Sequence, residues 1–152
     1  MIRLFRKLPK SEHTSSFDHK DKIVVGFYED VVLRGRTIRA KIDSGASTSS
    51  IDAGLADFLG LGPVFGSTTV VSSHGRGIRP LLKEDIEIGG RKFNASFTIA
   101  RRHNLRYPLL IGKNILRKGF LIDPTKKLKK KKIKIIKNTK DLHNIENFGV
   151  IS

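Results

Sequence analysis

The chain has 152 residues, of which 38% are hydrophobic, so it suits one globular domain and a wholly disordered chain is excluded. The absence of cysteine excludes disulfide frameworks and thiolate zinc sites. The formal net charge of +16 is uneven, because residues 126–140 hold nine lysines and no acid whereas residues 21–125 hold sixteen basic and ten acidic side chains.

The first twenty residues are polar and show no periodic apolar face, which predicts a flexible lead over residues 1–20. The basic N-terminus has no apolar run of signal-peptide length, and no segment approaches the roughly eighteen apolar residues of a membrane span. We therefore expect a cytoplasmic protein without membrane contact.

Short strands dominate the pattern from Lys22 onward. A turn is expected near Gly35, and Gly89-Gly90 predicts a tight hairpin because both glycines accept positive φ. The expected strand segments are residues 22–28, 30–42 around the first turn, 67–71, 79–88, 92–100 and 107–112.

Two short helices interrupt this pattern. The first is expected from Ala53 to Leu59, capped by Asp52 and stopped by Gly60, and the second over residues 113–118. Helices of βαβ length are missing, which argues against a doubly wound parallel sheet. The sequence therefore predicts a mainly β domain over residues 21–125.

Residues 126–152 form a lysine-rich C-terminal tail. Such runs are usually solvated, and this interpretation is favoured over sequence-blind binding of nucleic acid through Lys126–Lys140. The alternating, β-branched "KIKII" of residues 132–136 also leaves open a strand that pairs in a dimer.

Motifs for cofactors and metals are weak. Residues 60–66 miss the dinucleotide fingerprint, and Gly112-Lys113 lacks the upstream glycine of a phosphate loop. The five histidines never fall at the i, i+4 spacing of a helical zinc pair. A triad of Ser44, His74 and an aspartate lacks the nucleophile elbow. No cofactor and no metal site is predicted.

Asp43 is the strongest candidate for chemistry. The alternating strand of residues 37–42 delivers its carboxylate to a strand end, and Ser44 and Gly45 then allow a sharp turn. For an isolated Asp-Ser-Gly, an Asx-turn that caps its own backbone is the favoured interpretation.

The surrounding sequence resembles a known family. Residues 40–52, "AKIDSGASTSSID", are similar to the active-site loop of retropepsin-like aspartic peptidases. Later pieces follow in that family's order: a glycine-bearing hairpin at residues 70–80 in the place of the flap, a hairpin at 84–100, and an apolar-apolar-Gly element with a short helix at 107–123. The resemblance covers residues 22–125 and implies an all-β, retropepsin-like closed barrel of short strands, with a flap hairpin and one or two short helices.

Within that superfamily the chain is most similar to the prokaryotic group labelled ATP-dependent zinc proteases, of the RimK-associated type. Residues 70–82, 88–99 and 106–124 carry this similarity. The chain departs from the group at Ser47, where a basic residue is usual, and at Asp52, near which a histidine is usual. These departures bear on specificity and leave the Asp-Ser-Gly core intact.

The resemblance implies a homodimeric aspartic endopeptidase that needs no cofactor, in which Asp43 of two subunits share one proton and activate water. Ser44 and Gly45 would hold the two loops together, with Ala46 and Gly112 as structural support. Substrate would meet the flap, although for His74 and Arg76 a plain surface hairpin is equally favoured. The implied flap residues are His74, Gly75, Arg76 and Gly77.

Arginines around the implied cleft suggest an acidic or glutamate-rich peptide as substrate, because guanidinium groups bind carboxylates in pairs. They are Arg76, Arg79, Arg101, Arg102 and Arg106. Two other functions stay open, a noncatalytic retropepsin-like dimerisation or binding module, and a basic-tailed β domain that binds nucleic acid.

Overall fold

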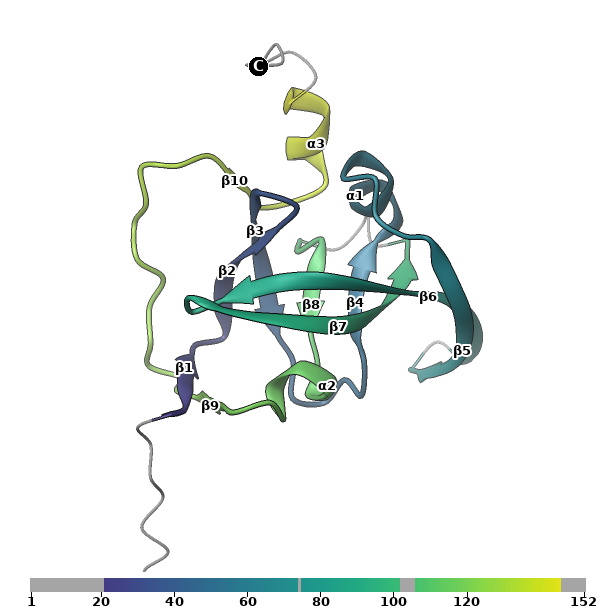
Figure 1. Cartoon of the computed structure of the whole chain (residues 1–152), viewed down its shortest axis with the longest axis horizontal. Coiled ribbons are helices and arrows are strands. Elements are labelled where there is room, and N and C mark those ends of the chain that lie inside the picture. Colours follow the sequence, from purple (N-terminus) through teal and green to yellow (C-terminus); the bar gives the residue numbers. More distant parts are fainter. Residues whose placement is uncertain (1–20, 74, 102–105, 146–152) are drawn as a thin grey trace, which may run out of the picture.

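The computed structural model describes residues 21–73, 75–101 and 106–145 (Figure 1). Its strands are β1 Ile23–Val25, β2 Tyr28–Leu33, β3 Arg36–Ile42, β4 Ser49–Asp52, β5 Val64–Ser72, β6 Gly75–Ile88, β7 Arg91–Ala100, β8 Leu109–Ile111, β9 Phe120–Ile122 and β10 Ile135–Ile136. Its helices are α1 Ala53–Phe58, α2 Lys113–Leu116 and α3 Lys140–Ile145. None of these helices has the length and apolar character needed to cross a membrane.

Six strands close into a barrel. They follow the order β3-β2-β6-β7-β4-β8, and β8 returns to pair with β3 in parallel, Ala40 opposite Leu109 and Ile42 opposite Ile111. The predicted all-β closed barrel is therefore confirmed. Strands β1 and β9 form a separate parallel pair beside it.

The core of the barrel follows from alternation along the strands. In β3, Ile38, Ala40 and Ile42 are buried, whereas Lys41 between them is exposed. Glu84 of β6 is a buried charge, and Arg34 neutralises it with two hydrogen bonds of 2.9 and 3.1 Å. These bonds raise the pKa of the Arg34 guanidinium above its ordinary value.

Both predicted hairpin turns are present. Arg34 and Gly35 join β2 to β3 with φ of 49° and 72°, and Gly89 and Gly90 join β6 to β7 with φ of 59° and 80°. Two consecutive residues with positive φ match the right-handed twist of the strands that they connect.

The two expected helices form where predicted. Asp52 caps α1 by accepting a hydrogen bond from the Leu55 N–H at 3.1 Å, and Gly60 follows with φ of 63°. The β domain therefore holds the one or two short helices expected, and a third helix, α3, lies beyond it in the C-terminal segment, where none was predicted. Its signal was present, because Asn138 and Asp141 bond each other's backbone N–H as a capping box.

The C-terminal segment pairs within its own chain. β8 covers only residues 40–42 of β3, so the upstream half of that edge is open, and β10 fills it with Ile135 opposite Thr37 and Ile136 opposite Ile38. Ile136 is buried in the core. The strand anticipated in "KIKII" therefore exists, but its partner in this structure is β3 of the same chain, not a second subunit.

Candidate active site

The loop between β3 and β4 presents Asp43 at the end of a buried strand. Its backbone N–H donates to the Ile111 carbonyl at 2.8 Å, and its Oδ1 accepts from the Gly45 N–H at 2.9 Å. The carboxylate is half-buried, and Oδ2 has no hydrogen-bond donor within the described part of the chain. One oxygen is therefore fixed in orientation by an Asx-turn, and the other is left for an outside partner.

Gly112 lies directly behind this loop. Its N–H donates to Ser49 Oγ at 2.9 Å, and the next N–H, of Lys113, donates to the Ala46 carbonyl at 2.8 Å. A Cβ atom on Gly112 would stand 2.8 Å from the Ala46 oxygen and 2.9 Å from the Thr48 carbonyl carbon. Only glycine allows the chain to pass this close, because both obstructing groups are backbone.

Asn114 and Ser49 complete the support of the loop, and neither was predicted from the sequence. Asn114 Oδ1 accepts from the Ser49 N–H and hydroxyl, each at 2.8 Å, and its Nδ2 donates to the Ser96 carbonyl at 2.8 Å. The network ties the start of β4 to α2 and β7. A weak signal existed in the hydroxyl run that enters β4, because a buried serine needs partners.

Other loop residues differ in exposure. Ser44, Gly45 and Ser47 are exposed, and Ala46 is half-buried. The Ser44 hydroxyl has no hydrogen-bond partner among the residues that the structure describes, so it is not engaged within its own loop. Asp52 is buried beneath α1, so its side chain is engaged with the helix.

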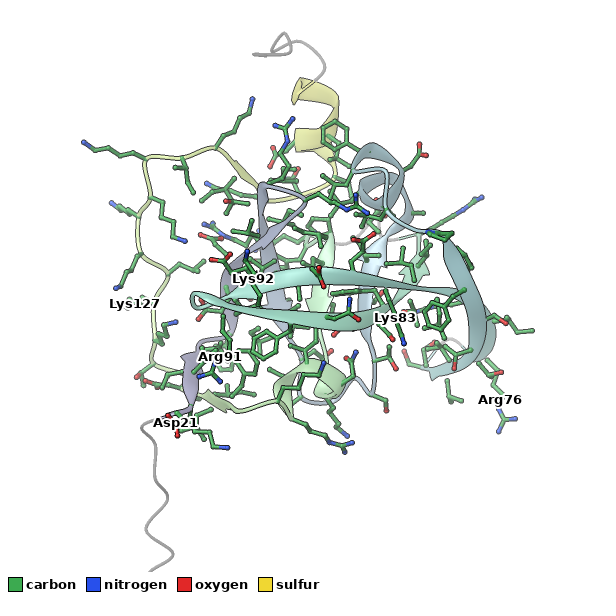
Figure 2. The ribbon with its side chains drawn as sticks, in the orientation of Figure 1. Asp21, Arg76, Lys83, Arg91, Lys92 and Lys127 are labelled. Atoms are coloured by element: carbon green, nitrogen blue, oxygen red, sulfur yellow. The ribbon has the colours of Figure 1, made fainter. Side chains whose placement is uncertain are left out.

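The predicted flap is the exposed hairpin of β5 and β6. Ser72 pairs with Gly75 at the outer end of the hairpin, and Gly75 has φ of 109°. Arg76 and Gly77 are exposed, and Figure 2 shows Arg76 at the outer end of this hairpin. His74 and Arg102 lie outside the described residues. Of the other predicted arginines, Arg101 and Arg106 are exposed and Arg79 is half-buried.

A cavity of about 410 Å³ lies where the flap, β7, α2 and the end of the Asp43 loop meet. Its charged lining residues are Lys83 and Lys118, and none of the described carboxylates lines it. Lys118 Nζ donates to the Asn94 carbonyl at 2.8 Å, and Lys83 Nζ stands 5.3 Å from the centre of the Phe65 ring. The remaining lining residues are Thr48, Thr68, Leu81, Asn94, Ala95, Ser96 and Asn114. The pocket therefore suits an anionic group.

Exposed apolar side chains gather near the other side of the loop. Phe27 is 53% exposed, and its carbonyl accepts from the Ile42 N–H, next to Asp43. Val24 and Ile122 are exposed on the neighbouring β1–β9 pair. Within the described residues, no group of three His, Cys, Asp or Glu side chains is placed to hold a metal ion.

Comparison with known proteins supports the fold. Residues 62–133 match the profile of the RimB-like family, described as retropepsin-like aspartic endopeptidase RimB. This match supports assignment to the retropepsin-like family, and the closed barrel is a retropepsin-like all-β fold. The matched range runs from β5 to the lysine-rich segment and does not include Asp43. No curated protein matches the chain in sequence.

A solved structure of similar fold is the crystal structure of Lpg0085, a protein of unknown function (DUF785) from Legionella pneumophila subsp. pneumophila str. Philadelphia 1. The TM-score is 0.50 at 20% sequence identity, and the likeness covers 71% of this chain and 98% of that chain. At this identity the likeness concerns the fold alone.

Proposed function

We propose that the protein is a homodimeric aspartic endopeptidase of the RimK-associated retropepsin-like group, with one Asp43 from each subunit. The observation that carries this proposal is the placement of Asp43, with Oδ1 held by the Gly45 N–H and Oδ2 without a donor in the described chain. A general base must hold its lone pair where the substrate arrives, and a fixed loop lowers the cost of reaching that geometry.

A second carboxyl group is needed for hydrolysis. One Asp43 carboxylate takes a proton from water as the water oxygen bonds to the peptide carbonyl carbon, while the other, protonated, gives its proton to the carbonyl oxygen. When the tetrahedral intermediate collapses, the C–N bond breaks, the amine nitrogen takes a proton from one carboxyl, and a hydroxyl of the intermediate gives its proton to the other carboxylate as the new C=O bond forms. Two such groups about 3 Å apart share one proton because both cannot ionise together.

A twin subunit is the natural source of the second group, because the sequence contains one Asp-Ser-Gly. The exposed Ser44 at the loop tip and the exposed Phe27 beside the loop supply surface for a two-fold contact there. When a partner subunit covers an exposed phenylalanine, the burial of its ring stabilises the dimer relative to separate monomers.

The first test replaces Asp43 by Asn. We expect peptide hydrolysis to fall by at least about 10²-fold, because an amide cannot exchange the proton, while the mass in solution stays that of a dimer. Asp57→Asn, on the exposed face of α1, is the matched control and should keep full turnover. Wild-type turnover in Asp43→Asn would exclude the aspartic mechanism. A stable dimer without hydrolysis in the wild-type protein would favour a noncatalytic dimerisation module.

The second test addresses the dimer. Phe27→Asp should give a monomer without peptidase activity. The two introduced carboxylates would be buried close to each other across the two-fold axis, where like charges repel. Phe65→Asp, equally exposed at 54% but on β5, should leave the mass of the particle unchanged. Full activity from a strict monomer would contradict the shared dyad.

We further propose that the substrate is acidic. Support comes from the cavity beside the Asp43 loop, whose lining among residues 21–73, 75–101 and 106–145 carries the charges of Lys83 and Lys118 alone. Two ammonium groups without a lining carboxylate favour the binding of a glutamate side chain. Arg76 adds a positive charge to the flap.

A peptide comparison tests this substrate class. A glutamate-rich peptide should be cleaved faster than a neutral peptide of equal length, and the preference should shrink as salt rises. Lys83→Gln with Lys118→Gln should reduce the preference by up to about fivefold per lysine, and Lys22→Gln should not. Equal rates for both peptides would reject the acidic substrate without affecting the aspartic mechanism.

A further inference from the structure

The lysine-rich segment is an anchored loop. Residues 127–134, here called the lysine strap, contain six lysines in eight positions and connect β9 to β10 (Figure 1). They have no helix and no strand, and the strap is visible as a long connection outside the barrel. What matters for its function is how its two ends are held.

The first anchor lies at Lys126. Its Nζ pairs with Glu29 Oε1 at 2.6 Å and donates to the Val24 carbonyl at 2.9 Å. Asp123 orders the turn just before Lys126 by accepting hydrogen bonds from the Thr125 N–H and hydroxyl. A Cβ on Gly26 would stand 2.6 Å from the Lys126 carbonyl oxygen, so the chain passes directly over a glycine.

The second anchor is β10 with α3. Ile136 is buried and pairs with Ile38 of β3, and Asp141 Oδ2 accepts from the Lys137 N–H at 2.7 Å. Leu142 of α3 packs against the edge of the core. The strap is therefore fixed at both ends, which reduces the entropy that binding to a partner would cost.

Most of the lysines between these anchors are unpaired within the part of the chain that the structure describes. Five of them are exposed and form no ion pair with a described carboxylate: Lys127, Lys129, Lys130, Lys131 and Lys132. Like charges this close repel one another, and the binding of a polyanion relieves this repulsion. Figure 2 places Lys127 on the opposite side of the molecule from Arg76, so this surface is separate from the flap.

We propose that the lysine strap binds the phosphate backbone of nucleic acid without reading its sequence. An extended chain advances about 3.3 Å per residue, and a duplex strand presents a phosphate about every 3.4 Å along its axis, so a strap of this length can reach several phosphates at once. This inference does not depend on the peptidase activity, because none of the strap residues belongs to the proposed active site.

The composition of the strap fits contact with phosphates that does not read sequence. It contains lysine and no arginine, and a lysine ammonium acts on phosphate as a point charge, without the fixed geometry of a guanidinium fork. A membrane surface is disfavoured because the strap has no aromatic residue and forms no amphipathic helix, and its exposed large apolar side chain is Ile133.

Binding of the full-length protein to labelled nucleic acid tests the proposal. The probes are a single-stranded RNA of about 12 nucleotides and a DNA duplex of similar length, titrated at several salt concentrations. Five neutralised phosphates predict a slope of log Kobs against log salt of about −3.5 for the single strand and about −4.5 for the duplex. A steep slope with either probe supports the proposal, and the tighter probe identifies the source of the phosphates.

Two triple variants that lose the same amount of charge distinguish the effect of the strap lysines from the effect of net charge. Lys129→Gln, Lys130→Gln and Lys131→Gln together should reduce the single-strand slope by about 2, whereas Lys22→Gln, Arg117→Gln and Lys140→Gln should leave it nearly unchanged. Equal losses in both variants would overturn the proposal. Tighter binding to polyglutamate or to anionic vesicles than to both nucleic acids would also overturn it.

Discussion

Strand β6 belongs to two regions that differ in nearly every physical respect. Its second half lies in the barrel, where Ile86 is 1% exposed, and its first half forms a two-stranded ribbon with β5, where Ile78 is 77% exposed. We call residues 67–72 and 75–80 the β5–β6 ribbon, because these residues pair only with each other. The same residue type in one continuous strand thus has opposite environments, because the barrel has strands on both sides and the ribbon has none beyond its own pair.

The difference explains how one fold combines a fixed loop with an accessible surface. The Asp43 loop is held by backbone and side-chain bonds to β8 and α2, all on the barrel side. The ribbon has few buried apolar groups, so its local opening costs less free energy than opening of the barrel. Substitutions of matched residues in the two regions test this comparison.

The largest expected effect comes from the two isoleucines of β6. Ile86→Ala should reduce the free energy of unfolding by about 3 kcal/mol, because it removes buried methylenes and leaves a cavity. Ile78→Ala should change it by less than about 0.5 kcal/mol. Chemical denaturation of both variants measures the difference, and similar values would mean that the ribbon is buried in solution.

The next effect comes from two glycines. Gly112→Ala should destabilise the protein by about 2 kcal/mol, because the new methyl group meets the backbone of Ala46 and Thr48 at under 3 Å. Gly77→Ala meets nothing within 4 Å and should be neutral or slightly stabilising. Thermal unfolding of the pair checks this, and tolerance of Gly112→Ala would show that the loop is able to shift.

A third pair compares serines. Ser49→Ala removes the acceptor of the buried Gly112 N–H, and should cost about 1.5 kcal/mol. Ser67→Ala on the exposed ribbon should cost less than about 0.5 kcal/mol. Amide hydrogen exchange at Gly112 gives a local measurement, since its protection should fall only in Ser49→Ala.

The smallest effect is expected at Thr125, on the exposed side of the barrel. The hydroxyl and N–H of Thr125 bond Asp123 and lower the pKa of its carboxyl below the ordinary 3.8. Because the pKa of the Asp123 carboxyl is lower in the folded protein than in the unfolded chain, its ionised form stabilises the fold above pH 3.8. This contribution disappears as the pH falls through the pKa of the folded state. Thr125→Val should therefore lose a little stability at neutral pH and converge with wild type in acid.

Thr69→Val on the β5–β6 ribbon is the control for this pH dependence. Its side chain is exposed, and no described carboxylate accepts a hydrogen bond from it. Its stability relative to wild type should be the same at all pH values. A parallel pH profile for Thr125→Val would indicate that the Asp123 contact is absent in solution.

Local sequence was sufficient for most strands of the barrel and for the position of Asp43 at the end of a strand. The strands were visible because apolar residues alternate, and the turns at Gly35 and Gly89-Gly90 because few residues accept positive φ. The cap at Asp52 required only a side chain and a backbone N–H three residues apart. These signals act over short distances along the chain, so a single sequence contains them.

Tertiary structure decided what depends on contacts between distant segments. The hydrogen bonds from Ser49 to Asn114 join residues 65 positions apart, and the pairing of β10 with β3 depends on how far β8 extends along that edge. The lysine run had the charge of a free tail, but buried Ile136 makes it an anchored loop. Composition determines the charge of the lysine run. Its position on the molecule is determined by the packed core, because the burial of Ile136 needs contacts with distant segments.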